Sequence, residues 1–215
     1  MSQPARKQRA RVPAATRRRG SLDETLINAA MDLFASYGYR GTSLARIARA
    51  AGVTKGALYW HFDDKEDFFL AVADRVLGEW AEVFENQTPA RDAREFRDRF
   101  TEIFETTAEL NERNPWVSRL LLIVALESHK IGPRVLRAMR RANARQLANL
   151  ESVIKRGLEL GVFRADLDVA SAATQVWSAT VGLEMLWYLR GPQFALRKSL
   201  RRAAADFLRH WGAAK

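Results

Sequence analysis

The chain has 215 residues, of which 47% are hydrophobic and 28% charged, and this is typical of a globular protein with a sizeable core. It has no cysteine, so disulfide scaffolds, thiolate metal sites and cysteine nucleophiles are excluded. Its three histidines are too widely separated for a metal-binding spacing, and its longest apolar run, residues 120–126, is much shorter than the ~20 residues of a membrane span. We therefore predict a cytoplasmic protein with no metal, no cofactor and no membrane contact.

The net charge of +10 is concentrated at the N-terminus. Residues 1–20 hold seven basic groups and no acidic group, whereas residues 21–66 hold five basic and six acidic groups. The first segment has no apolar periodicity, so we expect a flexible basic arm over residues 1–20. We expect no secretory signal, because no apolar stretch follows Arg19.

Beyond the arm, the regular segments have helical periodicity, and no useful run alternates with the period of a strand. The first helix is predicted over residues 22–37, because Gly38 follows at the position of a left-handed C-terminal residue. Its apolar stripe comprises Leu26, Ala30, Leu33, Phe34 and Tyr37.

A second, short helix is predicted to start after Thr42 or Ser43, either of which supplies an N-cap oxygen, and to end at Gly52. A third short helix starts only two residues later, with Thr54 as its N-cap. Gly52 is expected to adopt a positive φ in so tight a turn. Two short helices joined in this way, with a third in front, indicate a helix-turn-helix motif.

The core of this motif is expected to be small, with Val53 and Leu58 filling the space between the helices. Asp64 and Asp67 resemble a capping box at the start of a long fourth helix. The apolar stripe of this helix comprises Phe69, Val72, Val76, Trp80 and Val83. Five more helices are predicted, one over residues 90–113, one that starts near residue 115, and three over residues 133–160, 169–190 and 194–211. The fold class is therefore predicted to be all-α.

The residues of the third helix that point away from the core suit contact with a DNA duplex. Gly56 and Ala57 are small enough for a close approach, and Lys55 can reach a base edge or a phosphate. Aromatic residues at helical spacing are more often core residues, but Leu58 and Phe62 already occupy the inward positions here. The outward rings are those of Tyr59, Trp60 and His61.

The stretch over residues 42–62, which reads TSLARIARAAGVTKGALYWHF, together with Lys65, resembles the DNA-binding domain of the TetR family of bacterial transcriptional regulators. The closest similarity is to the AcrR-like branch, whose members often control efflux pumps. The LYWHF run and Lys65 are the most specific part of the motif. The match covers roughly residues 22–70, which is under a quarter of the chain.

The resemblance implies a homodimer whose subunits have a helix-turn-helix DNA-binding domain over residues 21–66 and an α-helical ligand-binding and dimerisation domain over residues 67–215. Thr42 or Ser43 would contact a phosphate at the start of the second helix. The third helix would lie in the major groove. The residues that would face the groove are Lys55, Gly56, Ala57 and Trp60, and those that would hold the DNA backbone are Tyr59, His61 and Lys65.

Asp63 departs from the family pattern, because members commonly carry a basic residue after the Phe. A carboxylate close to a phosphate is unfavourable, so a contact with the DNA backbone is not expected at Asp63. Arg17, Arg18 and Arg19 lie directly before the first helix, where an arm could enter the neighbouring minor groove. The alternative is a tail that attracts phosphates without any specific contact.

Polar residues that interrupt apolar stripes of the C-terminal domain are candidates for a ligand pocket, because buried polar groups need partners. Glu127, Asn143, Gln146 and Glu184 interrupt stripes in this way, and the alternative for each is a satisfied core hydrogen bond or a surface position. We expect a largely apolar pocket, in which Glu127 would favour cationic or amphipathic ligands. The predicted lining is Trp80, Phe100, Phe104, Trp116, Glu127, Asn143 and Gln146.

The last two predicted helices could form a four-helix interface with their copies in a second subunit. Their small and large apolar residues are Val169, Ala172, Ala173, Val176, Ala179, Thr180 and Leu183, beside a basic surface at Arg197, Lys198, Arg201 and Arg202. The same pattern is also compatible with packing inside one subunit.

These features predict a ligand-responsive DNA-binding transcriptional regulator, most simply a repressor that binds a palindromic operator as a homodimer. A small, largely apolar effector would release it, and control of an efflux system is one use. We predict no enzymatic activity, because the chain shows no activated Ser–His pair, metal cluster or phosphate loop. The alternative is a constitutive or architectural DNA-binding protein without an effector, which a screen of small molecules for operator release would distinguish.

Overall fold

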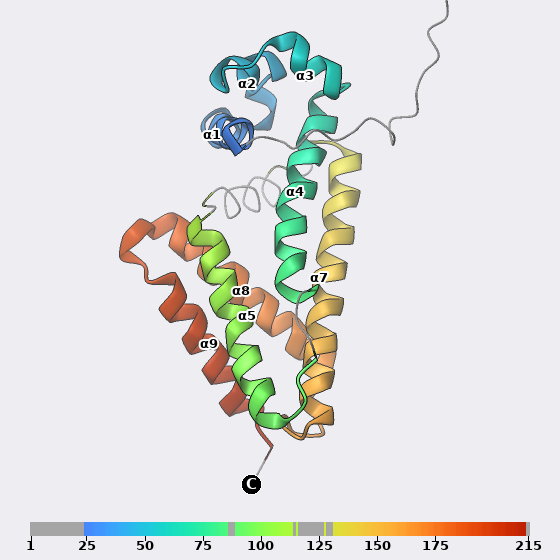
Figure 1. The fold of residues 1–215 in the computed structure, drawn as a ribbon, viewed down its shortest axis with the longest axis vertical. Helices are drawn as coiled ribbons and strands as arrows, with labels where there is room; N and C mark the ends of the chain where they lie inside the picture. Colours follow the sequence, from blue (N-terminus) through green and yellow to red (C-terminus); the bar gives the residue numbers. More distant parts are fainter. Residues whose placement is uncertain (1–23, 86–88, 114, 116–126, 128–130, 214–215) are drawn as a thin grey trace, which may run out of the picture.

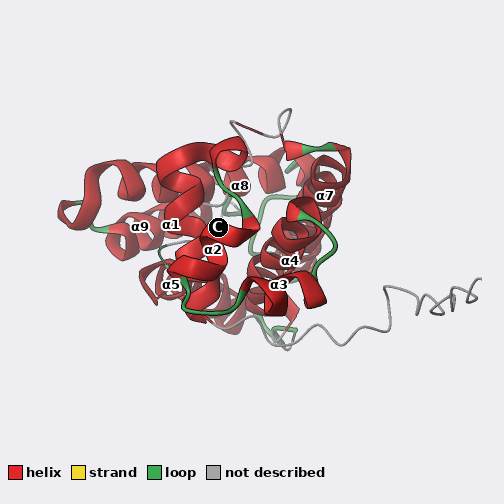
Figure 2. Ribbon diagram, turned by 90° about the horizontal axis from the view of Figure 1, so that it is seen from above, coloured by secondary structure: helices red, strands yellow, loops and turns green. Residues whose placement is uncertain are grey.

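The computed structural model describes residues 24–85, 89–113, 115, 127 and 131–213. Within these ranges the chain is all-α, as predicted, and Figure 2 shows helices joined by loops. Three N-terminal helices, α1 to α3, sit above a bundle formed by the other helices, and one long helix, α4, runs from the first group into the second (Figure 1). Among the described helices, none is both long and apolar enough to span a bilayer. The arm with Arg17, Arg18 and Arg19, the apolar run at residues 120–126, and Trp116 lie outside the described residues.

The first helix, α1 (Glu24–Gly41), is interrupted at Gly38, whose φ of 67° and ψ of 172° are not helical. The predicted end of its regular part is therefore confirmed. The prediction that Tyr37 belongs to the buried stripe is wrong, since this side chain is 52% exposed. The change of direction at Gly38 turns Tyr39 inward instead, where its ring lies 5.4 Å from that of Phe69. Tyr37 faces Arg46, whose guanidinium carbon lies 3.6 Å from the centre of the tyrosine ring.

The next two helices are α2 (Leu44–Ala50) and α3 (Lys55–His61), and both have the predicted kind of N-cap. The hydroxyl oxygen of Ser43 accepts from the N–H of Arg46 at 3.2 Å. The hydroxyl oxygen of Thr54 accepts from the N–H of Ala57 at 3.1 Å. Each cap satisfies one of the N–H groups that the first turn of a helix leaves without a partner.

The turn between α2 and α3 depends on Gly52, which has the expected positive φ, here 70°. Leu58 fills the core below the turn as predicted and is 3% exposed. The expectation that Val53 also belongs to this core is wrong, because its side chain is 41% exposed. Val53 closes the turn with its backbone instead, since its N–H donates to the carbonyl of Ala48 at 2.9 Å.

The long helix α4 spans Lys65–Glu85 and starts with the predicted capping box. The N–H of Asp67 donates to Oδ1 of Asp64 at 2.7 Å, and the N–H of Asp63 donates to Oδ2 of Asp67 at 3.4 Å. Phe69, Val72 and Val83 of the predicted stripe are buried, whereas the side chains of Val76 and Trp80 lie outside the described part.

The bundle below consists of α4 and the helices α5 (Ala93–Arg113), α7 (Pro133–Glu159), α8 (Val169–Arg190) and α9 (Leu196–His210), with a short 3-10 helix η2 (Gly191–Gln193) before α9. The helix α4 packs on α5 and α7, α7 also packs on α8, and α9 packs on α5 and α8 (Figure 1). The predicted N-cap of α8 is confirmed, because Oδ1 of Asp168 accepts from the N–H of Ala170 at 3.1 Å.

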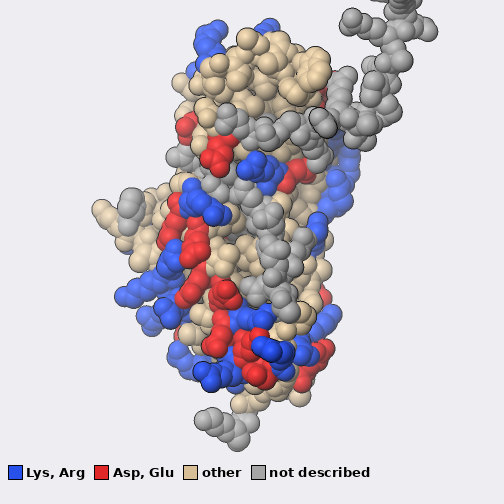
Figure 3. Space-filling view, in the orientation of Figure 1, with Lys and Arg blue, Asp and Glu red and all other residues tan. Residues whose placement is uncertain are grey.

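Two kinds of contact hold α9 in place. The rings of Phe207 and Trp211 stack 4.5 Å apart, and the carbonyl of Trp211 accepts from the N–H of Arg164 at 2.9 Å. Along the outer side, Arg197 of α9 pairs with Glu109 and Glu112 of α5 at 2.8 Å each. Figure 3 shows this row of acidic groups along α5 with basic groups of α9 beside it.

A pair of truncations tests the revised core of the helix-turn-helix motif. We expect Leu58→Ala to lower the free energy of unfolding by about 2–5 kcal/mol, because it leaves a cavity under the turn. We expect Val53→Ala to lower it by at most about 0.5 kcal/mol, because the removed methyl groups are exposed. Urea unfolding followed by circular dichroism measures both values, and equal losses would contradict the assignment of Val53 to the surface.

Candidate nucleic-acid interface and effector pocket

The helix α3 presents nearly all of its side chains to solvent. Leu58 is the one buried residue of the helix, and the ring of Trp60 is 74% exposed. The structure brings together on this exposed surface six of the residues predicted to contact DNA, namely Lys55, Gly56, Ala57, Tyr59, Trp60 and His61. Exposed aromatic side chains that lie next to one another often mark a surface that another molecule covers.

The exposed residues of α3 combine rings with one positive charge. The ammonium of Lys55 lies 5.4 Å from the centre of the Tyr59 ring. The rings of Trp60 and His61 meet edge to face, with centres 4.7 Å apart. A Cβ atom added to Gly56 would meet nothing within 4 Å, so the start of α3 is open to a close approach. The surface can therefore offer hydrogen-bond donors, apolar ring faces and a cation to one partner.

Ser43 and Thr42, the alternatives for a phosphate contact beside α2, have different surroundings. Ser43 is exposed at the N-terminus of α2, whereas Thr42 is 1% exposed. The hydroxyl of Thr42 lies 2.9 Å from the carbonyl oxygen of Gly38 and 3.0 Å from that of Leu33. The side chain of Thr42 therefore braces the end of α1, and Ser43 is the member of the pair that a phosphate can reach.

Lys65 also points inward. Its ammonium donates to the carbonyls of Tyr39 at 2.7 Å and Thr42 at 2.9 Å, and it lies 4.2 Å from the centre of the Tyr39 ring. Burial, and secondarily the charge of Arg40, lower the pKa of Lys65. Lys65 thus holds the loop before α2, and its expected contact with the DNA backbone stays a prediction.

Glu127 lies at the junction between the two groups of helices and is not among the residues that line the described pocket. Its carboxylate accepts from the N–H of Tyr39 at 2.8 Å. A Cβ atom added to Gly38 would come within 2.9 Å of Oε1 of Glu127, so the glycine also makes room for the carboxylate. The structure therefore places Glu127 beside the DNA-reading helices, contrary to its expected place in the ligand pocket.

A second junction joins α4 to α7. The carboxylate of Glu66, in the first turn of α4, accepts from the N–H of Arg134 at 3.0 Å and caps α7. The guanidinium of Arg134 pairs in return with Asp67 at 3.3 Å and with Asp64 at 3.8 Å. This junction could not be predicted from the sequence, because a capping residue is normally sought next to the helix that it caps.

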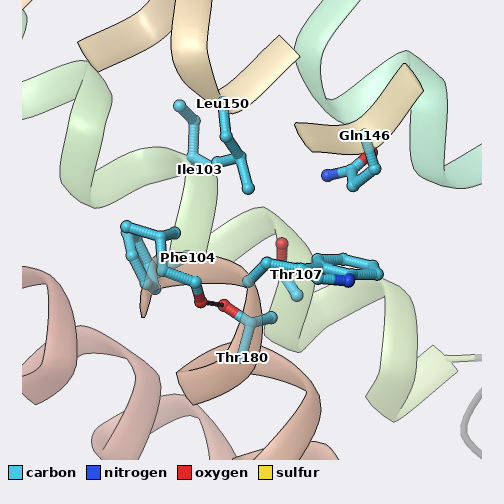
Figure 4. A pocket seen from close by; sticks show the side chains of 8 residues that line it. Ile103, Phe104, Thr107, Gln146, Leu150 and Thr180 are labelled. Atoms are coloured by element: carbon cyan, nitrogen blue, oxygen red, sulfur yellow. Dashed lines mark hydrogen bonds between the residues drawn. The ribbon is translucent and has the colours of Figure 1, made fainter. Parts of the chain in front are cut away.

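A small cavity lies between α5, α7 and α8 (Figure 4). Its volume of about 10 Å³ holds about one water molecule. Its lining is mostly apolar and comprises Ile103, Phe104, Thr107, Gln146, Leu150, Val176, Trp177 and Thr180. Phe104 and Gln146, two of the residues predicted to line a ligand pocket, lie at this cavity.

Two other residues predicted to line the pocket, Phe100 and Asn143, are not part of this cavity. Phe100 belongs to the aromatic core, where its ring centre lies 5.8 Å from that of Phe96 and 5.8 Å from that of Phe163. Asn143 is exposed, and its Oδ1 accepts from the indole N–H of Trp177 at 2.8 Å. The periodicity of α7 placed Asn143 in the apolar row, but only the packing of α8 shows that the amide lies at the edge of that row.

Two further buried residues, Asn111 and Glu184, form a polar pair between α5 and α8. Their exposed fractions are 0% and 1%, and the Asn111 amide donates to Oε1 of Glu184 at 3.0 Å and to the carbonyl of Thr107 at 3.0 Å. Burial raises the pKa of Glu184 to about 8, while the hydrogen bond from Asn111 acts in the opposite direction. Asn111 is a polar residue that interrupts the apolar stripe of α5. The same kind of interruption marked the candidate residues of α7 and α8, so it also marks Asn111.

Comparisons with known proteins agree with this arrangement. A family model described as "Bacterial regulatory proteins, tetR family" matches residues 26–72. The chain is 30% identical over 189 residues to the HTH-type transcriptional regulator AcrR of Shigella flexneri, which covers 85% of this chain and 86% of that protein.

Two solved structures show the same fold. One is the transcriptional regulator FadR from Bacillus subtilis in complex with stearoyl-CoA, with a TM-score of 0.67 and 20% identity over 86% of this chain and 96% of that chain. The other is SmeT, the repressor of the Stenotrophomonas maltophilia multidrug efflux pump SmeDEF. It has a TM-score of 0.65 and 22% identity, and the match covers 88% of this chain and 89% of that one.

The raised pKa of Glu184 predicts a specific pH dependence of stability. In the unfolded chain the carboxyl ionises near its ordinary pKa of 4.5, whereas in the folded protein it stays protonated up to about pH 8. The folded state therefore binds more protons between these values, and stability falls as the pH rises through this window. We expect the melting temperature of the wild type to fall relative to that of Glu184→Gln from pH 5 to pH 8, and parallel curves would contradict the shift.

Proposed function

Because this chain belongs to the tetR family of bacterial regulatory proteins, we propose that it is a cytoplasmic repressor that binds a palindromic operator as a homodimer and leaves it when a small effector binds the C-terminal helices. The observation that carries DNA binding is the solvent-facing surface of α3. Leu58 alone anchors this helix to the core, so the remaining side chains can enter a major groove without disturbing the fold.

The proposed contacts divide into two groups. Lys55, Gly56, Ala57 and Trp60 face the bases, while Tyr59, His61 and Ser43 hold phosphates on either side. Thr42 and Lys65 act behind this surface by fixing the loop from which α2 starts. The arm with Arg17, Arg18 and Arg19 adds attraction to the phosphates, which makes operator affinity depend on salt.

The proposed dimer surface lies near the end of α8. The small residues expected there, such as Ala172, Ala173 and Val176, are buried within the subunit. The large apolar side chains of the last turns are exposed instead, and these are Met185 (42%), Leu186 (44%), Tyr188 (37%) and Leu189 (64%). Binding to a palindromic operator requires the two α3 helices of such a dimer to lie on successive turns of the duplex, about 34–36 Å apart.

Effector release is supported by the two junctions described above. The helix α7 lines the cavity through Gln146 and Leu150 and is capped at its other end by Glu66 of α4. An effector that spreads α7 from α8 would therefore displace the first turn of α4 and, with it, the loop held by Lys65. Reciprocal coupling then requires that the effector and the operator weaken each other's binding. The resemblance of the helix-turn-helix motif to the AcrR-like branch, whose members often control efflux pumps, supports efflux as the regulated process.

The DNA surface is tested with the DNA region upstream of the protein's own gene as the operator probe. We expect Lys55→Ala and Trp60→Ala each to reduce affinity about tenfold or more, because each removes a base or phosphate contact from α3. The matched control is Lys155→Ala, which removes an exposed lysine of α7 that pairs with Glu151 at 3.7 Å. Fluorescence anisotropy measures affinity, and equal effects of K55A and K155A would argue against the α3 surface.

The dimer surface is tested with Leu189→Glu. We expect this change to shift the protein towards monomers, because an unpaired carboxylate would be buried in the contact. Light scattering after size exclusion gives the mass, and Ser152→Glu, on an exposed position of α7, serves as the matched control. A dimer that persists in L189E at micromolar concentration would place the contact elsewhere.

A further inference from the structure

The hydrogen bonding of the Glu184 carboxyl is incomplete. Oε1 accepts from Asn111, but Oε2 is buried without a hydrogen-bond partner among the described residues. A buried polar atom without a partner costs about 1–3 kcal/mol. A carboxyl that served only to join α5 and α8 would be expected to use both oxygens, or to be replaced by an apolar side chain. The unused oxygen therefore points to a partner that is bound at another time.

Among the described residues, a second polar atom without a hydrogen-bond partner lies near the contact between α5 and α8. The Nε2 atom of Gln146, which is 7% exposed, has no hydrogen-bond partner among the described residues, and Gln146 lines the cavity of Figure 4. Thr107 and Thr180 line the same cavity, and Asn111 and Glu184 follow them one turn later on the same faces of α5 and α8. One helical turn is about 5.4 Å, so the donor and the acceptor lie along one continuous strip.

The residues that line this strip favour a ligand of one charge over the other. The cavity is lined by apolar side chains, two threonines, Gln146 and Trp177, and none of its described lining residues is basic. An anionic group would find no counter-charge among these described residues. Among the described residues, burial and the Asn111 hydrogen bond are the causes that shift the pKa of Glu184, so no neighbouring cation already neutralises it. A cation placed against Oε2 would donate the missing hydrogen bond. It would also balance the negative charge of the carboxylate once Glu184 is ionised.

We propose that Glu184 recognises a cationic amine at one end of an amphipathic effector whose apolar body opens and fills the cavity beside Gln146. This assignment rests on the proposed function as an effector-released repressor. Binding of the amine converts the carboxylic acid of Glu184 to a carboxylate, and the proton leaves to the buffer. The amine keeps its own proton and donates it in the hydrogen bond to Oε2.

Three compounds that share one skeleton test the charge preference. They are 4-phenylbutylamine as the cation, 4-phenylbutanol as the neutral probe and 4-phenylbutyrate as the anion. We expect the wild-type protein to bind the amine at least tenfold more tightly than the alcohol, and the butyrate most weakly. We expect Glu184→Gln to abolish the preference for the amine. The matched control is Glu151→Gln, which removes an acid of α7 that pairs with Lys155 on the outer surface.

A second readout needs no variant. Isothermal titration calorimetry of the wild type at pH 7, in phosphate and in Tris, gives the number of protons released on binding. We expect close to one proton for the amine and none for the alcohol, because Glu184 is mostly protonated at this pH when no ligand is bound. A pairing of Glu184 and Asn111 that served only structure would release no proton.

Equal affinity for the amine and the alcohol, or failure of all three compounds to bind, would overturn the assignment of Glu184. So would an unchanged amine preference in E184Q. Operator affinity, measured without any of the compounds for the wild type and for E151Q, keeps the two proposals apart. Tight operator binding without amine selectivity rejects the role of Glu184 alone, whereas absence of operator binding rejects the proposed function itself.

Discussion

One ammonium group holds the loop that leads from α1 into the DNA-reading helices. The Nζ atom of Lys65 donates to the carbonyls of Tyr39 and Thr42, and both residues are buried. Buried carbonyls need donors, and α2 and α3 are too short to be stable helices by themselves. Their position therefore depends on the first turn of α4, from which Lys65 extends. A displacement of that turn would move the surface of α3 as a unit.

The same turn is tied to the C-terminal helices. Glu66 caps α7, and Glu127 holds the N–H of Tyr39 while Lys65 holds its carbonyl. Tyr39 is thus fixed from both sides of its backbone, and its own ring is buried. Burial first, and then the carboxylates of Glu66 and Asp64, raise the pKa of Tyr39 to about 12, so its hydroxyl stays neutral in this acidic neighbourhood. Short hydrogen bonds of this kind are either made or broken, with few arrangements in between. They therefore suit a junction at which a small displacement of the C-terminal helices moves the N-terminal ones.

The features that could be predicted from sequence are those that depend on neighbours along the chain. Ser43, Thr54 and Asp168 cap their helices because each acts on a residue two or three positions away. The apolar stripes followed from helical periodicity for the same reason. Helical periodicity does not hold across Gly38, where the helix changes direction. Tyr39 is therefore buried in place of Tyr37.

The partners of buried polar residues could not be predicted, because they are set by the packing of distant segments. Lys65 bonds to a carbonyl 26 residues away, and Glu127 bonds to an N–H 88 residues away. The residue types at α3 indicated a DNA surface without knowledge of these contacts. They did not distinguish the side chains that form the surface from those, such as Thr42, that hold it in place from behind.

Glu127 and Glu184 show why a polar interruption of an apolar run is an incomplete signal. Both glutamates interrupt such a run, and both carboxyls lie against groups of the protein. Glu127 accepts from a backbone N–H, whereas Glu184 meets one side-chain amide and is left with an unused oxygen. Keeping a buried acid in this state costs stability, and replacement by an apolar residue would often remove that cost. Stability alone therefore gives no reason for Glu184, and the binding of a partner that completes its hydrogen bonds does.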